Sequence, residues 1–105
     1  MLIKAGVDVR RMDPDLLKRL DCVDKIYLAN KETLTLIPPY GGTREELSLY
    51  CDGRAVDIAD PFKVSDKFWD KINDCFDQDY YVVFELERIL VQKPLKDPET
   101  PYVEY

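Results

Sequence analysis

The sequence contains no histidine, and it has only three cysteines among its 105 residues. Without histidine the chain has neither Ser-His-Asp nor Cys-His catalysis, and it lacks the commonest zinc ligand. The cysteines, Cys22, Cys51 and Cys75, are odd in number and form no Cys-x-x-Cys pair. We therefore expect free thiols in a reducing compartment. Cys51 precedes Asp52, whose charge disfavours a thiolate, so we expect Cys51 to be a packed or inert thiol.

Long hydrophobic runs and an excess of basic charge are also missing. No segment approaches the ~20 apolar residues that a membrane span needs. The first residues hold no long apolar stretch, so we expect no signal peptide. The chain has 15 Lys and Arg residues and 21 Asp and Glu residues, so its net charge is -6. This acidic charge disfavours binding to a nucleic acid backbone. These features predict a cytoplasmic protein that binds neither membrane nor nucleic acid.

The clearest local pattern is a helix over 13–29. Asp13 is suited to cap its first turn, and Pro14 is suited to the first helical position. Apolar residues follow at helical spacing and predict one buried stripe: Leu16, Leu17, Leu20, Val23, Ile26 and Tyr27.

The rest of the chain predicts short strands and one more helix. Strands are expected at 33–37, 54–58, 80–84 and 88–92, with the last two forming a hairpin. Residues 40–46 read as an exposed loop. Ser65 is expected to cap a second helix whose buried side carries Phe68, Trp69, Ile72 and Phe76.

This order of elements predicts an α+β fold, a small antiparallel sheet with two helices packed on one face. From Lys93 onward, prolines and mixed charges predict little packing. We therefore divide the chain into a domain over 1–94 and a Pro-rich acidic tail over 95–105. The tail is interpreted as a disordered or sheet-edge end, with a docking segment for a partner as the alternative.

One motif resembles a known family. Residues 48–57 read Ser-Leu-Tyr-Cys-Asp-Gly-Arg-Ala-Val-Asp. They resemble the Ser-x-His-x-x-Gly-x-Ala-x-Asp signature of the bacterial zinc D,D-carboxypeptidases, which share a fold with the hedgehog signalling domain. The match falls on Ser48, Gly53, Ala55 and Asp57.

The likeness extends beyond the motif. Residues 34–44 resemble the family's strand and substrate loop, and residues 79–91 resemble its closing hairpin, which usually reads Glu-x-x-His-x-His. Short single-domain members are common in phage lysis proteins and prophages. The resemblance therefore implies a hedgehog/D,D-peptidase-like domain of phage type.

The resemblance also implies that the metal site is lost. In the family, zinc is held by the motif histidine, the motif aspartate and the last hairpin histidine, and an acidic residue is the general base. The three ligand positions fall here on Tyr50, Asp57 and Leu90. The base falls on Glu85, and the other hairpin histidine on Arg88. Leucine coordinates no metal, and tyrosine would have to lose a proton with a reference pKa of ~10. We therefore expect no metal, no other cofactor and no catalytic residue.

We expect the charge of Arg88 to replace that of the metal. A guanidinium can bridge two carboxylates, here Asp57 and Glu85, while the Tyr50 hydroxyl donates to Asp57 and Leu90 fills the space of an imidazole. The expected consequences are a lower melting temperature for Arg88→Ala, and a non-additive loss when Asp57→Asn and Glu85→Gln are combined.

The predicted function is binding without catalysis. The candidate binding residues are Arg44, Ser48, Tyr50, Asp57, Glu85 and Arg88. The acidic charge favours a protein partner with a basic surface, for example a host enzyme or defence system inhibited inside a bacterial cell.

Two alternatives stay open. The first is a peptidoglycan-binding protein or residual cell-wall peptidase with an atypical metal site, in which Asp52, Asp57, Glu85 or Cys51 holds an ion such as Mg²⁺ or Ca²⁺. The second is a structural or assembly protein.

Overall fold

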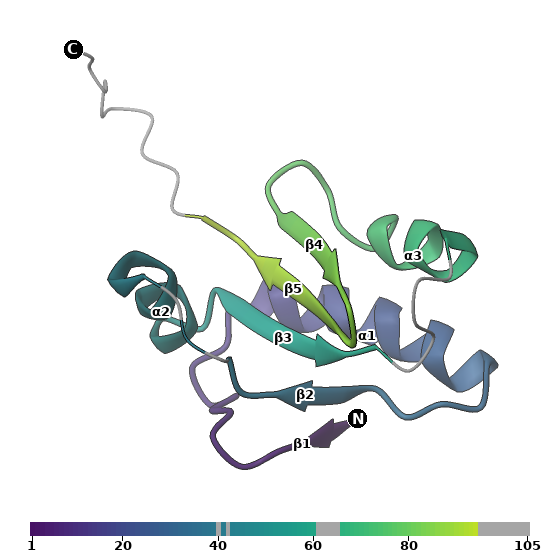
Figure 1. The fold of residues 1–105 in the computed structure, drawn as a ribbon, viewed down its shortest axis with the longest axis horizontal. Coiled ribbons are helices and arrows are strands. Elements are labelled where there is room, and N and C mark those ends of the chain that lie inside the picture. The colour runs from purple at the N-terminus through teal and green to yellow at the C-terminus, as the bar shows by residue number, and fades with distance from the viewer. Residues whose placement is uncertain (40, 42, 61–65, 95–105) are drawn as a thin grey trace.

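The computed structural model describes residues 1–39, 41, 43–60 and 66–94. They form a small α+β domain (Figure 1). Its elements are, in order, β1 (Leu2–Ile3), α1 (Pro14–Ala29), β2 (Thr35–Ile37), α2 (Arg44–Cys51), β3 (Ala55–Ala59), α3 (Asp66–Asn73), β4 (Tyr81–Glu85) and β5 (Arg88–Gln92). Within these described ranges, none of the helices combines the length and the apolar character that crossing a membrane requires.

The strands form one five-stranded sheet in the order β1-β2-β3-β5-β4. All neighbouring strands are antiparallel except β1, which pairs in parallel with β2. The expectation of a purely antiparallel sheet is therefore wrong, and the sheet is mixed. β1 has two residues, which is too short for an alternating pattern to reveal it in the sequence.

Helix α1 supplies the core on one face of the sheet and lies behind it in Figure 1. The expected bounds and the Asp13 cap are confirmed, with the Leu16 amide donating to the Asp13 carboxylate at 3.1 Å. Leu17, assigned to the buried stripe, is instead exposed, because its position points away from the sheet. The core that forms between the helices and the sheet includes Leu16, Leu20, Val23, Tyr27, Leu36, Val56, Ile58, Ile72, Ile89 and Val91.

A third helix, α2, begins at Arg44, where the sequence predicted that a loop would continue to residue 46. The correction has a local reason, because Arg, Glu and Leu are good helix formers and no proline follows. Positions 40 and 42 of the expected loop lie outside the described residues. So does Ser65, the expected cap of α3, which begins at Asp66.

The end of α2 explains the glycine of the motif. Gly53 has a φ of 73°, the left-handed conformation that favours glycine. Its amide donates to the Tyr50 carbonyl, and the Arg54 amide donates to the Leu49 carbonyl, which together form a Schellman cap. Gly53 therefore ends α2 and turns the chain directly into β3.

Gly53→Ala is expected to destabilise the fold by more than the about 1–3 kcal/mol that a left-handed conformation costs a residue other than glycine. A Cβ at this position would lie 2.0 Å from the backbone oxygen of Arg11, in addition to the strain of the left-handed conformation. The matched control is Gly41→Ala, whose Cβ would meet no atom within 4 Å. Urea unfolding of both variants tests the expectation, and equal midpoints for the two would contradict it.

The cysteines depart from the expectation of free thiols. Cys22 in α1 and Cys75, just after α3, form a disulfide across a sequence separation of 53 residues. Cys51 is the free cysteine, and its side chain is exposed rather than packed. Spacing in the sequence could not reveal the disulfide, because it depends on how α3 docks against α1.

The chain stays attached to the domain slightly past β5. The Arg54 guanidinium donates to the carbonyls of Lys93 and Pro94, both at 2.9 Å. The Lys93 ammonium pairs with the Asp13 carboxylate at 3.1 Å. Lys93, expected to begin a segment that packs little, is thus anchored. The tail assigned to 95–105 lies outside the described residues.

Candidate functional site

Asp57 lies in the middle of β3 and faces away from the core. Its neighbours Val56 and Ile58 are buried against α1, so the alternation of a strand places Asp57 on the opposite face of the sheet. In the register of the sheet Asp57 is directly opposite Leu90 of β5 on one side and Ile37 of β2 on the other. The strand therefore puts a carboxylate on the face of the sheet that α1 does not cover.

Two side chains bind this carboxylate. The Arg88 guanidinium donates to Asp57 Oδ2 at 2.5 Å, and the Tyr50 hydroxyl donates to Asp57 Oδ1. Arg88 also donates to the Pro38 carbonyl at 3.2 Å. The side chains of Asp57 and Arg88 are only 2% and 9% exposed, so this is a buried ion pair. Both contacts expected for Asp57, one from Arg88 and one from Tyr50, are present.

The expected bridge from Arg88 to Glu85 is not among the ion pairs of the described residues. Glu85 is opposite Arg88 in the hairpin register, but its side chain is exposed on the edge strand β4. A surface carboxylate keeps its hydration, so it gains little from such a bridge. Leu90, the third ligand position that the resemblance implies, is half-buried and lies directly opposite Asp57 in the sheet.

The other candidate binding residues lie on α2. Arg44 and Ser48 are exposed, whereas Tyr50 in the last turn is half-buried and reaches Asp57. The structure thus joins three of the six candidates, Tyr50, Asp57 and Arg88, in one cluster. It leaves the other three at the surface.

The chemistry of the cluster does not suit a metal ion. Each carboxylate oxygen of Asp57 accepts a hydrogen bond, and a permanent cation occupies the position beside it. Within the described part of the chain, no group of three or more Cys, Asp or Glu side chains is arranged to hold a metal ion. The arrangement can anchor α2, β3 and β5 to one another through a single buried carboxylate.

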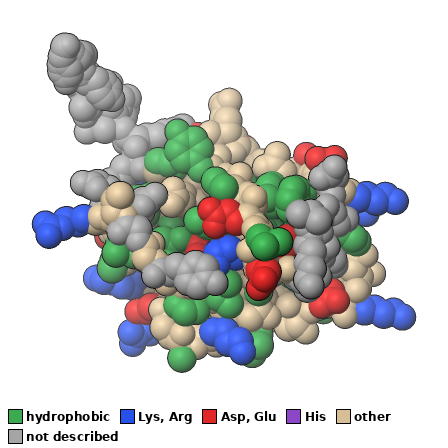
Figure 2. Space-filling model, viewed as in Figure 1, with side chains coloured by type: hydrophobic (Ala, Val, Ile, Leu, Met, Phe, Trp, Pro, Cys, Tyr) green, Lys and Arg blue, Asp and Glu red, His purple; other side chains and the backbone are tan. Residues whose placement is uncertain are grey.

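An apolar surface on the β4–β5 hairpin was missed by the sequence analysis. Tyr81, Val83 and Leu86 are 64%, 48% and 70% exposed, and we call these three residues the hairpin patch. Glu85 and Glu87 flank Leu86 and are exposed as well. The sequence predicted a strand at 80–84, but nothing local marks this strand as the edge of a sheet, so the exposure of its side chains was not predicted. Figure 2 shows the face opposite α1, with acidic, basic and hydrophobic side chains close together near its centre.

A second polar cluster joins α1 to the start of β4. The Tyr80 hydroxyl donates to Asp15 Oδ2 at 2.7 Å, and Arg19 pairs with Asp15 at 3.2 Å and with Asp77 at 2.9 Å. The hydrogen bond from Tyr80, followed by that from Arg19, lowers the pKa of Asp15. Burial and the same hydrogen bond raise the pKa of Tyr80, so its hydroxyl remains the donor.

This cluster predicts how stability depends on pH. The unfolded chain protonates Asp15 near its ordinary pKa of about 4, whereas the folded protein holds it ionised to lower pH. The contribution is therefore fully present above about pH 4, and it is lost as the pH falls through the lower folded pKa. Tyr80→Phe removes the largest cause of the shift, so its stability should fall less steeply with acid than that of the native chain.

Urea midpoints measured from about pH 6 down to about pH 2 test this expectation. The matched control is Tyr81→Phe, because Tyr81 is the neighbouring tyrosine and is exposed. Its acid profile should follow that of the native chain. Parallel profiles for Tyr80→Phe and the native chain would contradict the assigned role of the Tyr80 hydroxyl.

In comparisons with known proteins, no family model, no curated protein and no solved structure matches this chain.

Proposed function

We propose that the protein is a catalytically inactive, metal-free binding protein with a peptidase-like domain, and that it acts through contact with another protein. The observation that carries the proposal is the buried cluster of Tyr50, Asp57 and Arg88. Two of its residues, Tyr50 and Asp57, fall on positions at which the peptidases that the motif resembles hold zinc, and Arg88 falls on the position of their other hairpin histidine. Asp57, the acidic residue among the three ligand positions, is held instead in an ion pair that supports the fold.

The position of Glu85 further supports the absence of catalysis. A zinc peptidase needs its general base beside the metal, within hydrogen-bond reach of the attacking water. Glu85 is exposed on β4, whereas Asp57 is buried under Tyr50 and Arg88. A residual hydrolase would need both carboxylates to face one ion, and this arrangement does not favour it.

The hairpin patch supports the binding part of the proposal. β4 is an edge strand, and its sequence Tyr-Val-Val-Phe-Glu carries none of the lysines or prolines that usually protect such an edge. The apolar side chains are flanked by Glu85 and Glu87, in a chain of net charge -6. An apolar centre with an acidic rim fits a protein partner that has a basic rim around an apolar site.

Zinc binding tests the loss of the metal site. Equilibrium dialysis should find no stoichiometric zinc on the native chain, because Asp57 is already paired. The comparison variant combines Tyr50→His, Arg88→His and Leu90→His, which restores the family's ligand types around Asp57, and it should gain one zinc per chain. Stoichiometric zinc on the native chain, together with cleavage of a peptide ending in D-alanyl-D-alanine, would overturn the proposal.

Affinity capture tests the partner. The tagged chain should recover a protein from a bacterial lysate in a salt-sensitive manner, because charge steers the encounter. Leu86→Ser should reduce recovery. The control Leu28→Ser alters a similarly exposed leucine on α1, which is 61% exposed, and should leave recovery unchanged. Equal recovery with both variants would exclude the hairpin patch as the binding surface.

A further inference from the structure

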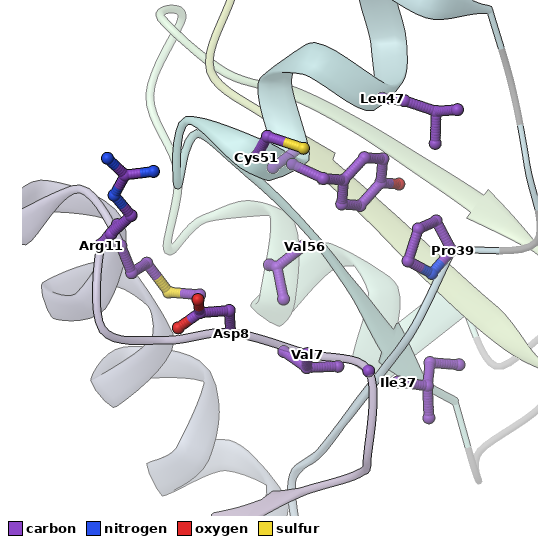
Figure 3. A pocket seen from close by; sticks show the side chains of 12 residues that line it. Val7, Asp8, Arg11, Ile37, Pro39, Leu47, Cys51 and Val56 are labelled. Atoms are coloured by element: carbon purple, nitrogen blue, oxygen red, sulfur yellow. The ribbon is translucent and has the colours of Figure 1, made fainter.

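A pocket of about 480 Å³ lies beside the buried cluster, because Tyr50 of that cluster is one of the residues that line it (Figure 3). The segment over residues 6–12 forms one wall, and α2 with the end of β2 and the start of β3 forms the rest. Most lining side chains are apolar: Val7, Met12, Ile37, Pro39, Leu47, Ala55 and Val56. A pocket of this volume and character is suited to the apolar body of a small molecule.

Two charged residues, Asp8 and Arg11, line the pocket, and they differ in whether they already form an ion pair. Asp8 is bound by Arg10 through two side-chain contacts of 3.0 Å, and these bonds lower the pKa of Asp8 to about 2. Arg10 therefore offsets the charge of Asp8, and Arg11 also acts on Asp8 electrostatically without forming an ion pair with it. Arg11 also lines the pocket and is exposed, and no ion pair of the described residues involves it. A single guanidinium thus remains available at the rim, in a chain whose net charge is otherwise acidic.

From this geometry we propose that the pocket binds a small apolar carboxylic acid, such as a medium-chain or aryl-substituted alkanoate. The alkyl or aryl body would occupy the apolar walls, and the carboxylate would pair with the Arg11 guanidinium, which matches a carboxylate bidentately. This site is separate from the hairpin patch and goes beyond the proposed function, because it assigns a second, small-molecule ligand.

The protein carries its own reporter for this site. Cys51 lines the pocket and is exposed, while Cys22 and Cys75 are joined in a disulfide. Under non-reducing conditions iodoacetamide therefore labels Cys51 alone, and intact mass measures the rate. Octanoate in the pocket should slow this alkylation, and the concentration that gives half protection reports the affinity.

Substitution of Arg11 tests the carboxylate contact. Arg11→Gln should raise the half-protecting concentration of octanoate about tenfold, because it removes a charge-assisted hydrogen bond. The same variant should leave protection by octan-1-ol unchanged, since the alcohol has no charge. Lys18→Gln is the matched control, as it removes one cation from an exposed site on α1, and it should bind octanoate as the native chain does.

Three results would overturn the proposal. The first is alkylation of Cys51 that octanoate does not slow at millimolar concentration. The second is an equal effect of Arg11→Gln on octanoate and octan-1-ol, which would show that Arg11 acts on packing rather than charge. The third is stronger protection by an acetylated peptide that ends in leucine, which would assign the pocket to a chain terminus instead of a free acid.

Discussion

Arg88→Ala is expected to lower the free energy of unfolding by about 3–5 kcal/mol, the range for breaking a buried ion pair by removing one partner. The loss is large because Asp57, 2% exposed, would be left as a buried charge with the Tyr50 hydroxyl and without its cation. Urea unfolding monitored by circular dichroism measures the change. Since the pair is shielded from solvent, added salt should alter the loss little.

A double-mutant cycle separates the pair from the packing of Arg88. Asp57→Asn combined with Arg88→Met should lose less than the sum of the two single variants, because each single variant leaves one unpaired buried charge and the double variant leaves none. Arg10→Ala is the control for a surface pair, since Arg10 is 87% exposed beside Asp8, and it should have little measurable effect. Additive losses at Asp57 and Arg88 would contradict the role given to the cluster.

Reduction of the Cys22–Cys75 disulfide is expected to lower stability by about 2–4 kcal/mol. The bond closes a long loop, with 53 residues of sequence separation, so removing it restores considerable freedom to the unfolded chain. It also links α1 to the segment just after α3, and both Ile72 of α3 and Phe76 of this segment pack into the core. Urea unfolding with and without dithiothreitol measures the loss.

The number of reactive thiols is the independent check. The native chain, alkylated without reductant after unfolding, should gain one adduct at Cys51, and after reduction it should gain three. Cys51→Ser should leave the stability of the oxidised chain unchanged, because Cys51 is exposed. Three adducts without reductant would show that the cysteines are free thiols.

Patterns that span only a few residues were sufficient to predict the bounds of α1 and β5. α1 was predicted with its correct bounds because Asp13, Pro14 and the apolar spacing all act within the helix. β5 was predicted from Arg88 to Gln92 for the same kind of reason. β1 was missed because two residues carry no pattern, and α2 was missed although its residues are good helix formers.

The candidate site was predictable in part. Opposite charge and the likeness of the motif led to the contacts of Asp57 with Arg88 and Tyr50. The position of Glu85 was not predictable, because whether a strand is central or at an edge depends on the order of the whole sheet.

The sequence by itself determined the α+β class, the long first helix, the hairpin and the contacts of Asp57 with Tyr50 and Arg88. Tertiary structure alone decided the Cys22–Cys75 bond, the parallel pairing of β1, the exposure of the hairpin patch and the pocket at Arg11. The physical reason is that helix and strand periodicity arises between near neighbours in the chain. Disulfides, edges and pockets arise between segments that come together only when the sheet and helices pack.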